Sequence, residues 1–89
     1  MLIALIGRDK PGALQTRLDN RDAHVAYLKG SGVVSQAGPL LDDAGQMMGS
    51  LVILDVADMA IAEAWVADDP YGKAGLFASV ELIPWNKVI

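Results

Sequence analysis

The residues best suited to proton-transfer chemistry lie within residues 17–24. His24 is the only histidine of the chain, and it follows Arg21 by three positions and Arg17 by seven. Residues at such spacings share one side of a helix, so the three side chains can line one groove. An imidazole with an unperturbed pKa of about 6.5 can act as a base or an acid near neutral pH. The stretch therefore predicts a site that combines positive charge with a proton-transfer group.

The best candidate for a carboxylate beside His24 is Asp69, in the stretch Asp68-Asp69-Pro70-Tyr71. Asp69 follows Trp65 by four residues, so it extends the inner stripe of a helix predicted over residues 59–68. An aspartate at the C-terminal end of a helix is disfavoured by the helix dipole. Either Asp69 serves as a cap or turn residue, or it has a second role facing the sheet.

Arg21 interrupts a stripe that should be apolar. A helical wheel places five residues within a band of roughly 80°: Leu14, Leu18, Arg21, Val25 and Leu28. Arg17 and His24 flank this band. Because burying an unpaired guanidinium is costly, Arg21 must reach an anionic partner or extend along the helix to water. The plainer alternatives are an arginine paired with a carboxylate at the sheet edge, and a histidine that serves packing alone.

Two helices and four strands are expected to position these residues. Apolar and alternating runs predict strands over residues 2–6, 33–38, 47–56 and 77–85. Helical periodicity predicts helices over residues 13–29 and 59–68, the first stopped by residues 30–32 and the second capped by Asp58. Residues 7–12 and 39–46 are expected as loop and turn, and residues 71–75 as an irregular turn after Pro70.

The order βαββαβ is typical of an α+β, ferredoxin-like fold, with a four-stranded antiparallel sheet and two helices on one face. The other sheet face would carry apolar side chains, including Ile83 and Trp85. Large uncovered apolar faces are usually interfaces, so we expect a twofold homodimer with its sheets face to face. The alternative is a monomer whose core takes up Met47, Met48, Trp65 and Trp85.

The composition limits the function classes. The 89 residues fit a single domain over 1–89, and they include no cysteine, 7 basic and 11 acidic residues, for a net charge of −4. This balance argues against nucleic acid as a partner. Four of the seven basic residues nevertheless fall in the first quarter of the chain: Arg8, Lys10, Arg17 and Arg21. With no signal-peptide pattern and no apolar run of about 20 residues, we expect a soluble cytoplasmic protein that does not enter the membrane.

Several familiar sites are not indicated. One histidine and no cysteine leave no spacing suited to a transition metal, and residues 7–12 match neither glycine-rich phosphate-binding pattern. Ser50 and Ser79 lack the strand-turn-helix context of a hydrolase nucleophile. Residues 49–54 carry none of the basic and aromatic residues with which RNA-binding sheets stack bases. We therefore expect neither a metal nor another cofactor.

The sequence resembles the YciI-like family along nearly its whole length. The stretches that carry the resemblance include Arg8-Asp9-Lys10, Arg21-Asp22-Ala23-His24, Ala37-Gly38-Pro39, Gly49-Ser50, and Asp68-Asp69-Pro70-Tyr71 through Gly75-Leu76-Phe77. The resemblance implies a ferredoxin-like dimer, related to the dimeric α+β barrels, with a His–Asp pair in a cleft. Characterised relatives include a dehydrochlorinase that acts on a chlorinated aromatic compound.

The resemblance also implies roles for particular residues. His24 would be the general base or acid and Asp69 its orienting partner. Arg21, Ser50 and Tyr71 would line the cleft and bind the substrate, and the turn at Gly38-Pro39 would shape its floor. Arg17, which helix spacing places in the same groove, is expected to bind the substrate with them. The turn between the second and third strands is shorter here than in some members.

Two functional hypotheses follow. One is a lyase- or isomerase-like enzyme in which His24, oriented by Asp69, moves a proton on a small cyclic or anionic substrate. The other is a non-catalytic module that binds a small metabolite in the same cleft. A purely structural dimer would require Arg17, Arg21 and His24 to be fully solvated.

Overall fold

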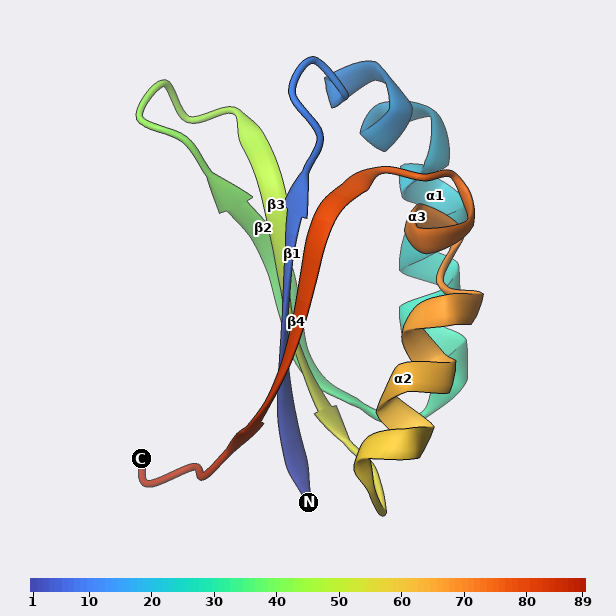
Figure 1. The fold of residues 1–89 in the computed structure, drawn as a ribbon, viewed down its shortest axis with the longest axis vertical. Coiled ribbons are helices and arrows are strands. Elements are labelled where there is room, and N and C mark those ends of the chain that lie inside the picture. The colour runs from blue at the N-terminus through green and yellow to red at the C-terminus, as the bar shows by residue number, and fades with distance from the viewer.

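A computed structural model of the chain describes residues 1–89 and contains four strands and three helices. The elements follow in this order: β1 (Leu2–Asp9), α1 (Leu14–Ser31), β2 (Val34–Leu41), β3 (Met47–Asp55), α2 (Met59–Asp68), α3 (Pro70–Lys73) and β4 (Phe77–Trp85). The strands form one antiparallel sheet in the order β2-β3-β1-β4, and the helices cover one of its faces (Figure 1). The predicted βαββαβ order and the ferredoxin-like α+β class are confirmed.

Two strands run further than the sequence pattern indicated. β1 continues beyond Ile6 to Asp9, because Arg8 pairs with Gly49 of β3 and Asp9 with Phe77 of β4. β2 likewise continues to Leu41, so the turn that was predicted to begin at Pro39 is wrong there, and Pro39 pairs with Ser50 inside the sheet. A proline is tolerated there because β2 is an edge strand. The extension of β1 brings the Asp9 side chain onto the helix-covered face, where it contacts Arg17 of α1.

The helix boundaries follow local rules. α1 ends where Gly32 adopts a left-handed conformation with φ 73°, which glycine enters without a steric penalty. α2 begins after Asp58, whose side chain accepts a hydrogen bond from the Ile61 backbone N–H. The predicted irregular turn after Pro70 is instead a single helical turn, α3. This short helix decides where Asp69 and Tyr71 point.

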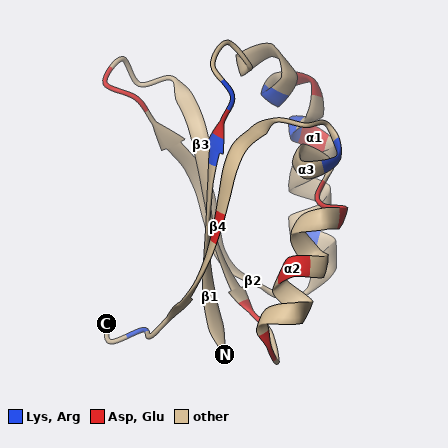
Figure 2. Cartoon of the chain, viewed as in Figure 1, with Lys and Arg blue, Asp and Glu red and all other residues tan.

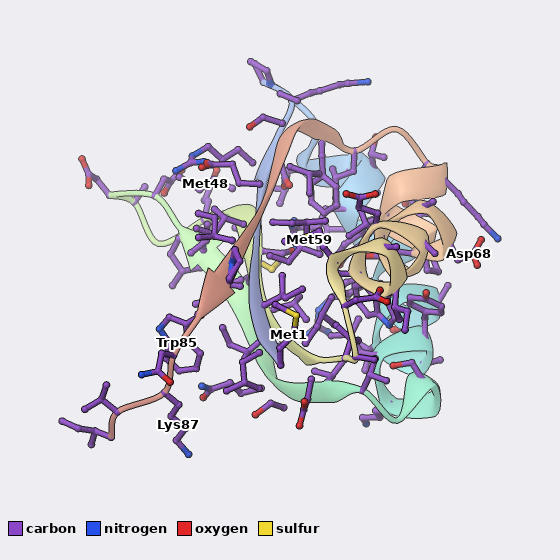
Figure 3. All side chains as sticks on the ribbon, turned by 60° about the horizontal axis from the view of Figure 1, so that its bottom comes forward. Met1, Met48, Met59, Asp68, Trp85 and Lys87 are labelled. Carbon is purple, nitrogen blue, oxygen red and sulfur yellow. The ribbon has the colours of Figure 1, made fainter.

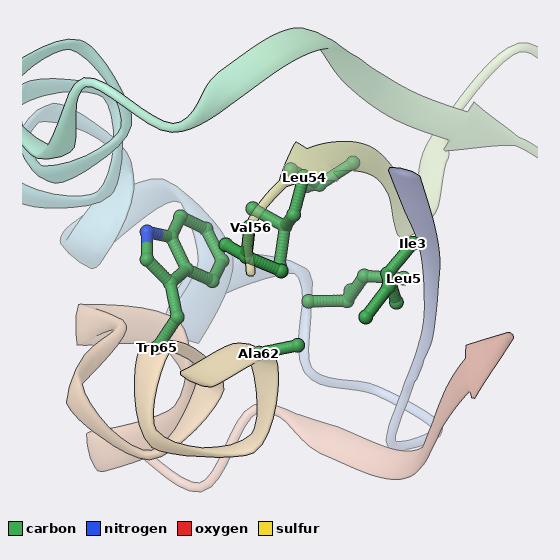
Figure 4. Close-up of a cluster of buried hydrophobic side chains, with 7 residues drawn as sticks. Ile3, Leu5, Leu54, Val56, Ala62 and Trp65 are labelled. Carbon is green, nitrogen blue, oxygen red and sulfur yellow. The ribbon is translucent and has the colours of Figure 1, made fainter. Parts of the chain in front are cut away.

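The hydrophobic core fills one end of the space between sheet and helices. Its buried members come from β1, β3 and α2 and from the residue that follows β3: Ile3, Leu5, Val52, Leu54, Val56, Ala62 and Trp65 (Figure 4). Ile3 lies opposite Leu54, and Leu5 lies opposite Val52, in the pairing of β1 with β3. Residues directly opposite each other share a face, so these four side chains point together toward the helices.

The predicted inner face of α1 is wrong by about one position. Leu18 was placed on the buried stripe but is 47% exposed, and Arg21 is also exposed. Arg17 and His24 are the residues of α1 that are buried. These two side chains can be buried because polar groups on β1, on β3 and at the start of α3 form hydrogen bonds with them. A purely structural dimer is therefore contradicted, because it required these side chains to be solvated.

The second face of the sheet is uncovered. Leu51, Ile83 and Trp85 remain 39%, 44% and 40% exposed. Trp85 pairs with Leu2 and lies on the side of the sheet away from the helices (Figure 3). The idea that both tryptophans fill a monomer core holds for Trp65 alone. No helix combines the length and the apolar character needed to cross a membrane.

Candidate active site

The histidine and the aspartate singled out from the sequence are in direct contact. His24 Nδ1 lies 2.7 Å from Asp69 Oδ1, and both side chains are buried. Because a carboxylate accepts hydrogen bonds, the contact favours the tautomer in which Nδ1 carries the proton. The lone pair of the neutral ring is then on Nε2. The pair joins α1 to the junction of α2 and α3, although His24 and Asp69 are 45 residues apart in the sequence.

The position of Asp69 explains why an acidic residue stands at the end of α2. Its backbone ends α2 and begins α3, and its Oδ1 also accepts a hydrogen bond from the Tyr71 backbone N–H at 3.1 Å. The carboxylate is thus the N-cap of α3, where the local dipole favours negative charge. The cap fixes the carboxylate in the orientation that meets His24.

An aromatic ring stacks on one face of the imidazole. The Tyr71 ring lies parallel to His24, with 3.7 Å between ring centroids and 15° between planes. Phe77 meets Tyr71 edge-on at 6.1 Å between centroids. A side chain on Gly7 would collide with the Phe77 ring, whose nearest atom lies 2.7 Å from where a Cβ would stand. Glycine at position 7 therefore makes room for the ring that supports the stack.

Arg17 forms a second buried polar group next to this stack. Its Nε and Nη2 donate to the two carboxylate oxygens of Asp9 at 2.7 and 2.9 Å, and Nη2 also donates to Ser50 Oγ at 2.9 Å. The Arg17 and Asp9 side chains are only 3% and 6% exposed. The guanidinium carbon lies 4.7 Å from the Tyr71 ring centroid, within the range of a cation–π contact. One tyrosine ring thus contacts both the histidine and the arginine.

The titration of two site residues is perturbed. Burial lowers the pKa of Arg17, but hydrogen bonds and charge from Asp9 outweigh burial and raise that pKa above its usual value. Burial raises the pKa of the Tyr71 hydroxyl, although the positive charge of Arg17 opposes this. Arg17 is therefore a permanent cation and Tyr71 is a neutral hydroxyl across the physiological pH range.

A cavity of about 460 Å³ opens between α1 and the sheet beside these groups. Its ionisable lining residues are Arg17, Arg21, His24, Lys29 and Tyr71, and no aspartate or glutamate lines it. The chain as a whole carries a net charge of −4, so this lining has the opposite character to the protein. Much of the basic charge lies at the end of the molecule where β1 leads into α1 (Figure 2). A cavity lined in this way suits an anionic or phenolic molecule.

Six of the seven predicted site residues line this one cavity: Arg17, Arg21, His24, Pro39, Ser50 and Tyr71. The seventh, Asp69, lies behind His24 and does not reach the cavity. Arg21 lies at the exposed edge and has no carboxylate within 4 Å, so the expected arginine–carboxylate pair belongs to Arg17 instead. Their roles in binding and catalysis stay predictions.

Asp9 is the polar residue of this region that sequence reasoning missed. It belongs to the Arg8-Asp9-Lys10 stretch, but a strand expected to end at Ile6 left it in a loop. Counting alternate positions from Ile3 and Leu5 would have placed Asp9 on the buried face of a longer strand. No group of three or more histidine, aspartate or glutamate side chains is placed to share a metal ion.

The family model for the YCII-related domain matches residues 1–86. The chain belongs to this family. Its relatives include Protein YciI of Escherichia coli, which is 35% identical, and a protein of Haemophilus influenzae, which is 34% identical; each alignment covers 99% of both chains.

Solved structures place this YCII-related chain near an enzyme. It resembles 5-chloro-2-hydroxyhydroquinone dehydrochlorinase (TftG) from Burkholderia phenoliruptrix, solved in complex with 2,5-dihydroxybenzoquinone. The TM-score is 0.88 at 36% identity, covering 97% of this chain and 94% of the enzyme. Rv0793 from Mycobacterium tuberculosis has a TM-score of 0.65 at 11% identity over the whole of both chains, a likeness of fold alone.

Proposed function

We propose that this YCII-related protein is a lyase- or isomerase-like enzyme of the dehydrochlorinase type. His24 would transfer a proton on a small cyclic, anionic or phenolic substrate bound in the cavity. The observation that carries the proposal is the contact of 2.7 Å between His24 Nδ1 and Asp69 Oδ1, on a histidine that lines a cavity without acidic residues. The similarity to a dehydrochlorinase at 36% identity supports the reaction class.

The chemistry follows from this arrangement. In the keto tautomer of a hydroxylated ring, the carbon that bears the leaving group is tetrahedral. His24 Nε2 accepts a proton from a ring hydroxyl, and the electrons of the O–H bond form a carbonyl. The ring double bond shifts, and the leaving group departs as an anion with the electrons of its bond to carbon. The net loss is one proton and one anion, which is HCl when the leaving group is chloride.

Each neighbour has a defined part in this step. Asp69 accepts from Nδ1–H and stabilises the imidazolium that forms when Nε2 takes the proton. Arg21, unpaired at the cavity edge, offers positive charge to a phenolate or carboxylate. Arg17 is already neutralised by Asp9, so it acts through its place over Tyr71 and beside Ser50.

The test measures chloride release from 5-chloro-2-hydroxyhydroquinone and a panel of related chlorinated phenols. We expect His24→Ala to abolish turnover while ligand affinity stays within about tenfold, because the lost interaction matters mainly in the transition state. Asp69→Asn should lower kcat strongly, and the exposed neighbour Asp68→Asn is its matched control. Turnover that survives in His24→Ala would refute the proposed role of this residue.

A non-catalytic binding module is the rival outcome of the same experiment. In that case the phenols would raise the melting temperature of the wild-type protein, but no chloride would appear after long incubation. Binding would then be lost equally from the His24 and Arg21 variants, because both would serve recognition alone.

We also propose that the protein acts as a homodimer joined through the uncovered sheet face. The exposed Leu51, Ile83 and Trp85 support this, since apolar side chains gathered on one face usually mark an interface. Light scattering at micromolar concentration should give twice the mass of the chain. Ile83→Asp should shift the protein to a monomer, whereas a monomeric wild-type protein would exclude this assembly.

A further inference from the structure

The cavity extends well past the histidine. Its lining on α1 runs from Arg17 to Lys29, which is 12 residues or about 18 Å of helix, and Gly32 lines it just beyond the end of the helix. The sheet gives the same direction independently. Arg17 bonds Ser50, which pairs with Pro39, and four residues further along β3 Leu54 pairs with Val34, another lining residue. The cavity is therefore a groove that follows α1, with the His24 site occupying only part of its length.

The far part of the groove differs chemically from the His24 end. Beyond His24 the lining is mainly apolar, with Val25 and Leu28 from α1 facing Val34 from β2. Lys29 lies at the same end and makes no ion pair within 4 Å. Arg21 and Lys29 are thus two unpaired cations eight residues apart, about 12 Å along the helix, with an apolar strip between them.

The size of the groove points the same way. Its volume of about 460 Å³ lies in the range of about 300–1,000 Å³ typical of sites for drug-sized ligands. A single substituted ring held at His24 leaves the apolar strip uncovered. A ligand that fills the groove must therefore extend toward Lys29.

We propose that the segment lined by Val25, Leu28, Lys29 and Val34 is a second subsite, which binds an apolar arm ending in an anionic group. The substrate would then be a phenolic ring with an aliphatic carboxylate arm. The ring lies at His24 and Arg21, the arm over Val25 and Leu28, and the carboxylate at Lys29. This inference rests on the proposed function, because it assumes that the ring occupies the His24 end.

The test compares three probes by titration calorimetry: phenol, para-pentylphenol and 6-(4-hydroxyphenyl)hexanoate, whose five-carbon arm ends in a free carboxylate. Burial of the arm should make para-pentylphenol bind at least about tenfold more tightly than phenol, because the burial of two CH2 groups is already enough for that gain. The terminal carboxylate should add about threefold, the effect of a solvent-exposed ion pair. Equal affinity for the three probes would overturn the subsite.

Variants assign the effect to residues. Lys29→Gln should remove the gain from the carboxylate and leave para-pentylphenol binding unchanged, and Lys87→Gln, remote from the groove, is its control. Val25→Asp should remove the gain from the arm while phenol still binds. Lys29 also lies in the last turn of α1, where its positive charge stabilises the helix through the helix dipole. The melting temperature of each variant is therefore measured without ligand, to separate a loss of stability from a loss of binding.

The two proposals fail differently. If phenol binds and turnover depends on His24, but the arm brings no gain, the second subsite is excluded and the proposed function stands. If the arm-bearing probes bind equally well to Arg21→Gln and the wild type, and His24→Ala keeps its turnover, the proposed function fails and the subsite fails with it.

Discussion

The two ends of the space between helices and sheet have opposite character, although the same elements build both. Along the inner face of β1, Ile3 and Leu5 come first and Asp9 comes last. β3 runs the other way, so Leu54 faces Ile3 and Ser50 faces Gly7. One end of the interior is therefore hydrocarbon, and the other holds Arg17 with its partners.

The difference teaches how a small chain accommodates a polar site. The apolar end stabilises the fold by removing hydrocarbon from water, which depends little on orientation. The polar end stabilises only if each buried group finds its partner, because an unpaired buried charge is costly. Two contacts meet that condition here: the double hydrogen bond from Arg17 to Asp9 and the His24–Asp69 contact.

The largest effect is expected from breaking the polar end at Asp9. Asp9→Ala leaves the Arg17 guanidinium buried without its carboxylate. We expect the free energy of unfolding in urea to fall by about 3–5 kcal/mol, the usual cost of removing one partner of a buried pair. The double variant Asp9→Ala/Arg17→Met should recover part of the loss, because it removes the unpaired charge.

The adjacent residue provides the control. Arg8 pairs with Glu81 on the uncovered face, where both side chains are about half exposed. Arg8→Gln, compared with the Asp9 variant in the monomeric Ile83→Asp background so that the proposed dimer does not cover this pair, should therefore cost only about 0–1 kcal/mol, as is usual for exposed ion pairs. Similar losses for the Asp9 and Arg8 variants would mean that burial does not distinguish the two pairs.

The apolar end is tested by Leu54→Ala. Leu54 is fully buried in the core, so the cavity left by the truncation should cost about 2–5 kcal/mol in the free energy of unfolding. Ligand affinity, measured by calorimetry well below the melting temperature, should stay unchanged, because Leu54 does not line the groove. A change in affinity as large as the change in stability would show that the two ends are coupled.

The fold was predictable because its signals are local. Alternation gave β4 and periodicity gave α2 with the bounds that the structure has, Phe77–Trp85 and Met59–Asp68. Strand ends were missed where polar residues continue a strand. Asp9 and Pro39 look like loop residues in the sequence, yet their neighbours in the sheet hold both in extended conformation.

The residues of the site could be predicted from the sequence, but most of the contacts between them could not. Hydrophobic periodicity puts Leu18 inside and Arg17 at the flank, because it contains no information on Asp9 and Ser50, the partners of Arg17 on the sheet. Tertiary partners reverse the preference, and Leu18 is exposed instead. The stack of Tyr71 on His24 was equally beyond the pattern, since it depends on the single turn of α3.

The smallest expected effect is a loss of stability at alkaline pH. It comes from the two tyrosines, one at each end of the interior. Tyr27 packs on Trp65 at the apolar end and donates to its carbonyl, and burial raises its pKa, as do Asp68 and Asp69. Burial also raises the pKa of Tyr71 at the polar end.

The sign of the pH dependence follows from these directions. An unfolded tyrosine loses its proton near its ordinary pKa of about 10, while the folded protein keeps both protons to higher pH. Above about pH 10 the unfolded state therefore binds fewer protons than the folded state, and the free energy of unfolding falls as the pH rises. Below that pH both states keep the tyrosine protons, so the tyrosines cause no change in stability. Tyrosinate absorbance should appear only above that pH in the folded protein. Tyr27→Phe and Tyr71→Phe should each remove one part of the alkaline loss of stability, and tyrosinate forming at or below pH 10 in either single variant would contradict burial of the tyrosine that remains.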